Sequence, residues 1–176
     1  MAPRAAGLTP AECQSHWRTA HADAARSLPG LRAYVQNHAV LRDGAPLLPY
    51  PGFDVCAETE FDDLEAMDAA FASEQYQGAI VADELKLIDK ERFTHALCER
   101  RVVRDDGGSV KLMTFLRGTP DPDADELLIV RHDFHVGRPD APFDAVEIRW
   151  FADTDAALAH ASPEHTGLIA EPNRVV

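Results

Sequence analysis

The sequence predicts an α+β protein built from two consecutive ferredoxin-like units, each with the element order β-α-β-β-α-β and an antiparallel sheet. Three observations lead to this fold class. Stretches with apolar residues at helical spacing alternate with stretches in which apolar and polar residues alternate one by one. The second half repeats features of the first half 90 residues later, as Phe143-Asp144 repeats Phe53-Asp54. A polar stretch with two glycines, Asp105-Asp106-Gly107-Gly108-Ser109, separates the halves as a linker.

The composition limits the partners. The chain of 176 residues has 17 Lys and Arg against 30 Asp and Glu, a formal charge of −13. This acidic balance argues against nucleic acid and anionic membrane surfaces, because both bind to concentrated basic surface. No apolar run reaches about 18 residues and no secretory leader is visible, so we expect a cytoplasmic protein that does not enter a membrane. Cys13, Cys56 and Cys98 match neither a disulfide framework nor a zinc spacing, so we expect free thiols.

The first half opens with a helix, predicted over residues 10–26. Thr9 is a good N-cap, Pro10 suits the first helical position, and Glu12 completes a capping box. Acidic residues mark the first turn of a second helix. After the first helix we expect strands at 31–41 and 53–59, a helix from 62 to about 73, a strand around 85–88 and an extended stretch at 99–104.

Alternation in the strand at 31–41 places Tyr34, Gln36 and His38 on one face and aliphatic residues on the other. If the aliphatic face packs on the helices, the polar face looks toward the opposite side of the sheet. The three polar groups are then in a position to bind a substrate through hydrogen bonds.

The second half is expected to hold strands at 110–116, 132–136 and 145–151, helices at 121–130 and 154–161, and an extended segment at 166–176. This places one unit at residues 1–105 and a degenerate second unit at 109–176. The opening strand of the first unit is weak or missing, because residues 1–7 are rich in alanine; either the unit lacks it or the real start codon lies upstream. The alternative to duplication is one α+β domain whose halves are similar by chance.

Two blocks of the first half resemble a known family. Leu8-Thr9-Pro10-Ala11-Glu12, continuing through His16-Trp17-Arg18 to His21-Ala22, resembles the first helix of EthD-domain proteins. The segment Leu28-Pro29-Gly30-Leu31-Arg32-Ala33-Tyr34-Val35-Gln36-Asn37-His38 resembles the strand that follows it. The acidic helix at Phe61-Asp62-Asp63-Leu64-Glu65-Ala66 and the aspartate Asp83 are similar too. The resemblance covers about residues 8–100, and the second half matches poorly.

The resemblance implies a dimeric-type α+β barrel, in which two ferredoxin-like units pair their sheets and a pocket lies beside each sheet. Two units in one chain would form an intrachain pseudo-dimer, and a homodimer is a further option because of the unpaired edge. Members of this superfamily include cofactor-free monooxygenases, cyclases, decarboxylases, dehydratases and isomerases. EthD proteins are associated with ethyl tert-butyl ether degradation and with polyketide pathways, and the family is commonly assigned oxidoreductase activity.

The resemblance and the residue chemistry together predict the site. A partly buried histidine both accepts and donates a proton near neutral pH. Trp17 and His21 are four residues apart on one helix, so their side chains are neighbours. The candidate catalytic residues are His21 and His38, and the candidate substrate-binding residues are Trp17, Tyr34, Gln36 and Asp83.

Each candidate also has a purely structural interpretation. Trp17 fills a core as most large aromatic residues do. His21 serves as a boundary histidine bonded to a backbone carbonyl, and Tyr34 and Gln36 bind each other or water. Asp83 caps a helix or a turn.

We expect neither a metal nor another cofactor. His132 and His135 lie three apart on a predicted strand and face opposite sides, and a third ligand beside Asp133 and His135 is not identifiable. The sequence has no Gly-rich phosphate motif and no Gly-x-Ser-x-Gly elbow.

The leading functional hypothesis is an enzyme without a bound cofactor, of oxidoreductase or monooxygenase type or of lyase or cyclase type. Its partner would be a small apolar organic molecule, a carbonyl or phenolic compound. The alternative is a non-catalytic small-ligand binding or accessory protein of a degradation or polyketide pathway; a damaged reading frame is a third option. Convergence of His21 and His38 on one apolar-lined cavity would favour the enzyme.

Overall fold

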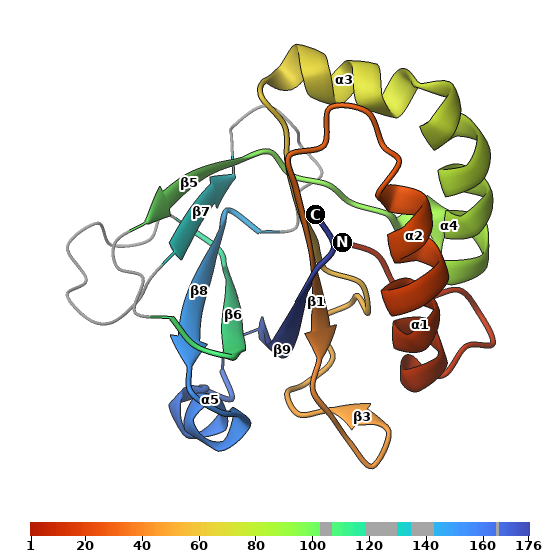
Figure 1. Cartoon of the computed structure of the whole chain (residues 1–176). Helices are drawn as coiled ribbons and strands as arrows, with labels where there is room; N and C mark the ends of the chain where they lie inside the picture. Colours follow the sequence, from red (N-terminus) through yellow and green to blue (C-terminus); the bar gives the residue numbers. More distant parts are fainter. Residues whose placement is uncertain (103–106, 119–129, 135–142, 165) are drawn as a thin grey trace. The chain divides into compact units, whose positions relative to one another are not determined.

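Helices and antiparallel strands make up the chain, which confirms the predicted α+β class (Figure 1). The structure is a computed structural model of all 176 residues and describes residues 1–102, 107–118, 130–134, 143–164 and 166–176. The chain divides into two compact units, each assembled from separate stretches of sequence. The first unit comprises Met1–His38, Gly52–Phe93 and Pro172–Val176, and the second comprises Ala39–Pro51 and Thr94–Glu171. Within the described residues, no helix is long and apolar enough to span a membrane.

The predicted first helix is present, with an internal irregularity. It runs as α1 (Pro10–His16), a π-helical turn η1 (Trp17–His21) and α2 (Ala22–Ala25), with Arg26 at its C-terminal cap. The Thr9 side chain accepts a bond from the Glu12 backbone N–H, and the Glu12 carboxylate accepts one from the Thr9 N–H at 2.8 Å. This confirms the predicted capping box, which satisfies two N–H groups that have no partner within the helix.

A second helical layer follows in the same unit. It consists of α3 (Leu64–Ala72) with Asp63 as N-cap, the π-helical turn η2 (Tyr76–Ile80), α4 (Val81–Leu87) and the short 3₁₀ turn η3 (Lys90–Arg92). The strand predicted around residues 85–88 is wrong, because most of this stretch belongs to α4. The buried residues Ile80, Glu84 and Leu87 recur at helical spacing, a pattern that a window of four residues does not reveal.

The strands of the first unit are β1 (Ala33–Ala39) and β4 (Ala57–Glu60), which pair antiparallel with Tyr34 opposite Thr59. The C-terminal segment lies beside β1, where the Val175 N–H donates to the Tyr34 carbonyl at 2.8 Å. Residues 1–7 form no strand; Ala2 and Arg4 make isolated bridges with Val55 and Ile88.

The polar face of β1 packs differently from the expectation. Tyr34, Gln36 and His38 are buried on the side of η1, where the Gln36 amide donates to the Trp17 carbonyl, whereas Ala33 and Val35 are half-buried. The prediction that the aliphatic face packs on the helices is therefore wrong. A polar face can cover a helix because its side chains supply hydrogen bonds to groups that burial would otherwise leave unpaired.

The core of the first unit gathers around Trp17, which is fully buried. Its neighbours come from the N-terminal segment, α1, the stretch before β4 and the end of α4. The buried members are Ala2, Cys13, Trp17, Val55, Leu87 and Ile88, with Leu8 and Phe93 packed against them. The three cysteines are free, as predicted; Cys13 and Cys56 are buried and Cys98 is exposed.

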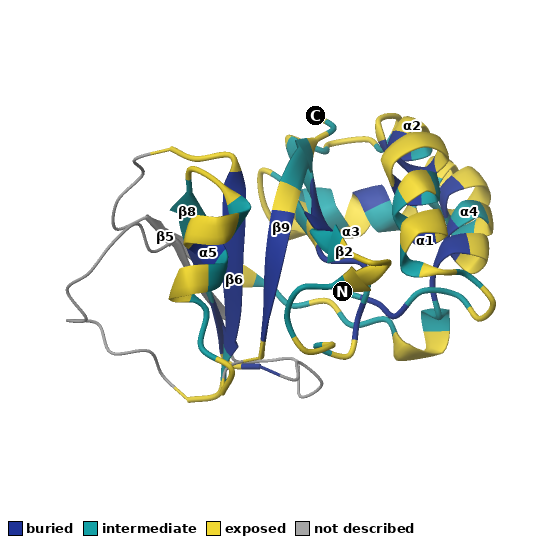
Figure 2. Ribbon diagram, turned by 90° about the horizontal axis from the view of Figure 1, so that it is seen from below, coloured by how far each residue is buried: buried dark blue, intermediate teal, exposed yellow. Residues whose placement is uncertain are grey.

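The second unit contains a sheet and one helix. Its strands are β5 (Cys98–Val102), β6 (Val110–Leu116), β7 (Val130–Phe134), β8 (Ala145–Phe151) and the first part of β9 (Thr166–Arg174), in the order β9-β6-β8-β7-β5. The helix α5 (Thr154–His160) covers one face, over Val110, Leu112 and Ile169. Figure 2 shows β6 buried along most of its length and the outer side of α5 exposed. A two-residue turn at Asp43-Gly44 joins the small strands β2 (Leu41–Arg42) and β3 (Ala45–Pro46).

Most of the helix predicted at 121–130 cannot be compared, because residues 121–129 lie outside the described residues. Its last residue, Val130, begins the strand β7. His135 and the linker residues Asp105 and Asp106 lie outside them as well. One feature of the 90-residue offset is visible: Asp63 caps α3 by accepting from the Ala66 N–H, and Asp153 caps α5 by accepting from the Ala156 N–H. The tandem ferredoxin-like arrangement and the boundary at 105–109 remain predictions.

Candidate functional site

A buried cluster of polar and aromatic side chains links the first helix, β1, α4 and the C-terminal segment of the first unit. We call it the histidine cluster. It includes every residue that the sequence predicted for the site, together with two others. Its members are His16, Trp17, His21, Tyr34, Gln36, His38, Asp83 and Asn173.

One carboxylate holds two histidines. Asp83 on α4 accepts from Nε2 of His16 through Oδ1 at 2.7 Å and from Nδ1 of His21 through Oδ2 at 2.9 Å. The side chains of His21 and Asp83 are 10% and 15% exposed, so solvent screens this contact only weakly. Because a carboxylate only accepts hydrogen bonds, Nδ1 of His21 carries a proton. Nε2 of His21 has no partner within the part of the chain that the structure describes.

The π-helical turn explains how both histidines reach Asp83. Residues five apart on a regular α-helix point about 140° apart, since each residue turns the helix by about 100°. In η1 the Ala22 N–H donates to the Trp17 carbonyl, five residues back. This wider turn brings His16 and His21 to the same side of the helix. Such single π turns within α-helices are frequent at functional sites.

The phenol of Tyr34 lies between two donors. Its oxygen accepts from Nε1 of Trp17 at 2.8 Å and from the Gln36 amide at 3.3 Å. Burial raises the pKa of Tyr34 to about 12, so the side chain is a neutral phenol at pH 7. Its own hydroxyl hydrogen has no acceptor among the described residues. His21 meets the Tyr34 ring edge-on, with ring centroids 6.3 Å apart.

Gln36 occupies the centre of the histidine cluster. Its amide nitrogen donates to the Trp17 carbonyl at 2.7 Å, and its oxygen accepts from the Asn173 amide at 2.9 Å. Nε2 of His38 lies 3.0 Å from the same oxygen. Since this oxygen is an acceptor, Nε2 of His38 carries the hydrogen and Nδ1 holds a lone pair.

His38 is buried and stacks on Trp17, with ring centroids 4.6 Å apart. Burial, and secondarily the charge of Arg18, lowers the pKa of His38 to about 4, so the ring is neutral at pH 7. Its Nδ1 atom is inaccessible and has no hydrogen-bond partner in the described part of the chain. A buried lone pair without a donor is costly, and it marks a place where a hydroxyl group or a water molecule would be stabilised.

The six predicted residues therefore lie in one cluster, in which His21 and His38 have different partners. His21 contacts Tyr34 and Asp83, whereas His38 contacts Trp17 and Gln36. Asp83 was expected before a strand and lies instead on α4, with both carboxylate oxygens bonded to histidines.

Sequence reasoning missed two members, His16 and Asn173. His16 was visible only as part of a family block, because its spacing of five from His21 does not place them together on a regular helix. Asn173 follows Gln36 by 137 residues, and no local pattern connects the two.

The histidine cluster provides proton-transfer groups in a weakly solvated setting. Asp83 fixes the ring of His21 so that Nε2 is the nitrogen that can take up or release a proton. Among the described residues, no group of three or more His, Cys, Asp or Glu side chains has the geometry of a metal site.

Comparison with known proteins identifies one family. Residues 5–91 match the family model described as EthD domain, and this range contains every residue of the histidine cluster except Asn173. No curated protein and no solved structure shows significant similarity to the chain. Through residues 5–91, the chain belongs to the EthD-domain family.

Proposed function

We propose that the chain is a cofactor-free enzyme that transfers a proton to or from a small, mostly apolar carbonyl or phenolic compound. One observation carries the proposal. Asp83 holds His21 through Nδ1 at 2.9 Å, and the opposite nitrogen has no partner among the described residues. A ring anchored in this way presents one basic nitrogen in a fixed direction, which is what general acid/base catalysis requires.

The other members of the histidine cluster then have distinct roles. His21 is the acid/base. The Nδ1 atom of His38 is enclosed by protein in this structure, so the histidine cluster must open before that lone pair accepts a hydrogen bond from the substrate hydroxyl. Tyr34 then donates its free hydroxyl hydrogen to a substrate oxygen. Gln36 orients both groups, and Trp17 forms the wall on which the apolar part of the substrate packs. Asp83 borders the substrate and positions His21.

The neutral state of His38 favours a substrate that donates a hydrogen bond. A protonated imidazole has no lone pair, whereas the low pKa of His38 keeps Nδ1 an acceptor at pH 7. A phenol or an enol supplies the matching O–H group. Nε2 of His21 then takes up a different substrate proton, that of the C–H group beside a carbonyl, so that His21 becomes protonated and the substrate becomes an enolate. Lyase or cyclase chemistry can proceed from this anion directly, and oxidoreductase or monooxygenase chemistry can proceed from it with dioxygen as the oxidant.

The family resemblance supports the oxidoreductase class, since EthD proteins are associated with ethyl tert-butyl ether degradation. The second candidate is a non-catalytic small-ligand binding or accessory protein of a degradation or polyketide pathway. One observation favours it: many polar atoms of the histidine cluster already bind one another, as the four hydrogen-bond contacts of the Gln36 amide illustrate.

A paired experiment separates the two candidates. The wild-type chain and a His21→Ala variant are incubated in D₂O with a panel of phenols and 1,3-diketones. Native mass spectrometry then reports ligand capture, and NMR reports deuterium uptake and turnover. We expect both proteins to capture the same compound and the variant to lose at least 100-fold in turnover.

The control is His95→Ala, which removes an exposed histidine outside the histidine cluster. Equal capture without turnover or exchange in any protein would overturn the catalytic proposal and favour the binding protein. Unchanged turnover in His21→Ala would overturn the assignment of His21.

A further inference from the structure

The second unit contains a cavity that the proposed function does not use. It has a volume of about 110 Å³ and lies between the sheet and the C-terminal end of α5. Strands β6, β8 and β9, the end of α5 and Leu48 all contribute to its wall. Apart from Leu48, the lining residues lie outside residues 5–91, which match the EthD domain.

The strand register explains why space is left there. Thr114 on β6 pairs with Glu147 on β8 and with Gly167 on β9, so these three positions form one row across the sheet. Gly167 contributes no side chain to this row. A Cβ atom at position 167 would lie 3.2 Å from the Leu48 side chain, which covers the glycine. Because position 167 has no side chain, Leu48 packs directly on the sheet there and forms one wall of the cavity, beside Thr114 and Glu147.

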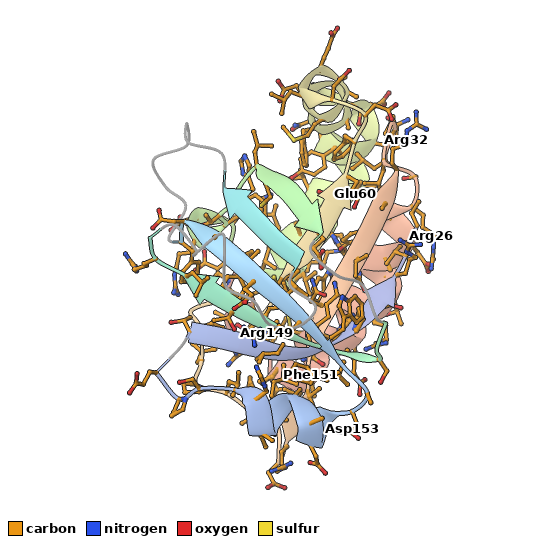
Figure 3. All side chains as sticks on the ribbon, turned by 90° about the vertical axis from the view of Figure 1, so that its left-hand side faces the viewer. Arg26, Arg32, Glu60, Arg149, Phe151 and Asp153 are labelled. Carbon is orange, nitrogen blue, oxygen red and sulfur yellow. The ribbon has the colours of Figure 1, made fainter. Side chains whose placement is uncertain are left out.

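The next row supplies a cation. Arg149 pairs with Leu112 across β6 and β8, two residues from Glu147 and on the same face of the sheet. Its guanidinium donates to one oxygen of Glu147, at 2.9 Å from Nη2 and 3.3 Å from Nε. Its Nη1 also contacts Nε2 of His160 on α5. Figure 3 labels Arg149 on β8, the strand that runs toward α5.

These contacts leave donor capacity on Arg149. A guanidinium has five N–H groups, and Glu147 and His160 use three of them. Because Arg149 only donates, Nε2 of His160 accepts and the neutral ring carries its hydrogen on Nδ1. The guanidinium of Arg149 thus pairs with Glu147 and still has two N–H groups for a ligand.

Thr114 provides an independent indication of a ligand. The residue is 8% exposed, and it lines the cavity. Its hydroxyl has no hydrogen-bond partner in the part of the chain that the structure describes. The hydroxyl oxygen is not among the inaccessible unpaired atoms of the described residues, so it stays accessible from the cavity that Thr114 lines. An acceptor atom in the cavity would satisfy it.

We infer that this cavity binds a small monocarboxylate. The carboxylate accepts from the free N–H groups of Arg149 and from the Thr114 hydroxyl, and its short apolar chain contacts Leu48 and Leu112. The volume holds about four water-sized groups at ~30 Å³ each, which corresponds to an acid of the size of propionate.

Titration of the full chain with sodium propionate tests this inference. NMR follows the backbone amides of β6 and β8 at constant ionic strength, and propionamide serves as the uncharged isostere. We expect saturable binding of propionate with a dissociation constant of about 1 mM, typical for so small a ligand, and no saturation with propionamide.

Two variants assign the residues. Thr114→Val keeps the shape and removes the hydroxyl, and the double variant Arg149→Met/Glu147→Gln removes the cation without leaving a buried acid unpaired. We expect each to weaken propionate binding at least tenfold. His21→Ala, in the first unit, should leave it unchanged, which separates this site from the histidine cluster.

Three results would overturn the inference: equal binding of propionamide, unaltered affinity in Thr114→Val, or no saturation of the wild type by 20-fold more propionate than the expected constant. If the double variant does not fold, Thr114→Val decides alone, since it changes only one hydroxyl group.

Discussion

Nδ1 of His21 lies 2.9 Å from Oδ2 of Asp83, a contact between residues 62 apart in the sequence. The same carboxylate binds His16, so one side chain fixes the orientation of two imidazoles. The contact connects the π-helical turn η1, which contains His21, with the helix α4, which contains Asp83. Its removal should therefore affect both the stability of the first unit and the state of two histidine rings.

The variant Asp83→Asn tests this relationship. An amide offers one acceptor and one donor, so it cannot accept from both histidines. We expect the free energy of unfolding to fall by about 2 kcal/mol, because hydrogen bonds to charged groups contribute about 1.5–3 kcal/mol each. Urea unfolding measures the loss, and ¹⁵N NMR of the imidazoles reports the change of tautomer. The control Glu65→Gln removes an exposed acid from the first turn of α3; an equal loss there would contradict the prediction.

Gln36→Leu should be the more damaging substitution. It removes the side-chain donor to the buried Trp17 carbonyl, which keeps the Ala22 N–H, and the acceptor of the half-buried Asn173 amide. Each lost partner costs about 1–3 kcal/mol, so we expect a loss of about 3 kcal/mol in total. Gln77→Leu is the matched control, because Gln77 is exposed and donates only to the Phe71 carbonyl. Thermal unfolding that shifts equally in both variants would refute the central role of Gln36.

The buried His38 predicts a pH dependence of stability. Its pKa is about 4 in the folded chain and 6.5 when unperturbed, so the unfolded chain binds more protons between these values. The free energy of unfolding therefore has its full value, as far as His38 is concerned, above pH 6.5, and it decreases as the pH falls toward 4. The loss approaches about 1.4 kcal/mol per pH unit for one proton.

The measurement compares the wild type with His38→Gln, which does not titrate. The difference between their free energies of unfolding should shrink steadily from pH 6.5 to pH 4. The exposed His95→Gln variant controls for the loss of one histidine. A pH-independent difference between wild type and His38→Gln would contradict the burial of a neutral ring.

The cysteines should differ sharply in reactivity. Burial raises the pKa of the Cys13 thiol to about 12, so almost no thiolate forms at pH 8. Cys56 is buried as well, whereas Cys98 is exposed. We expect a thiol reagent to label one cysteine per native chain within minutes and all three in urea. Cys98→Ser should abolish the fast reaction; rapid labelling of that variant would show that the first unit opens readily.

We expect alanine substitutions at two glycines to change the stability of the chain in opposite directions. A Cβ atom on Gly108 would lie 2.7 Å from the Phe151 carbonyl oxygen and 2.9 Å from its nitrogen, so Gly108→Ala forces apart the adjoining ends of β6 and β8. We expect a loss of more than about 2 kcal/mol, as for other overpacked sites. Gly78→Ala, within η2, meets no atom within 4 Å and should stabilise the chain by about 0.5–1 kcal/mol. Circular dichroism melting curves distinguish the two.

Local signals account for the parts of the fold that could be predicted. The N-caps Thr9, Asp63 and Asp153 act on backbone groups three residues away, so a short sequence window contains all the information. The strands β6 and β8 also begin and end where alternation places them. Strand-forming residues follow one another in both segments, so the ends of the strands can be read from the sequence.

The parts that could not be predicted depend on tertiary context. Residues 85–88 have strand-like composition, but the packing of Ile80, Glu84 and Leu87 makes the segment helical. The family blocks identified six members of the histidine cluster. The pairing of His16 with His21 needs a π-helical turn, which no spacing rule for regular helices contains. Asn173 joins Gln36 only through the path of the whole chain.

That last contact has a consequence for biosynthesis. Gln36 is made early, but the amide that binds its oxygen is added 137 residues later. The ribosome releases the chain from the N-terminus onward, so the first unit spends most of its synthesis without residues 172–176. During that interval the strand β1 can pair with β4 but lacks its neighbour on the other side, and the Gln36 oxygen lacks the Asn173 amide. The nascent first unit is therefore the form most exposed to misfolding and to chaperones, and only the late segment can relieve it.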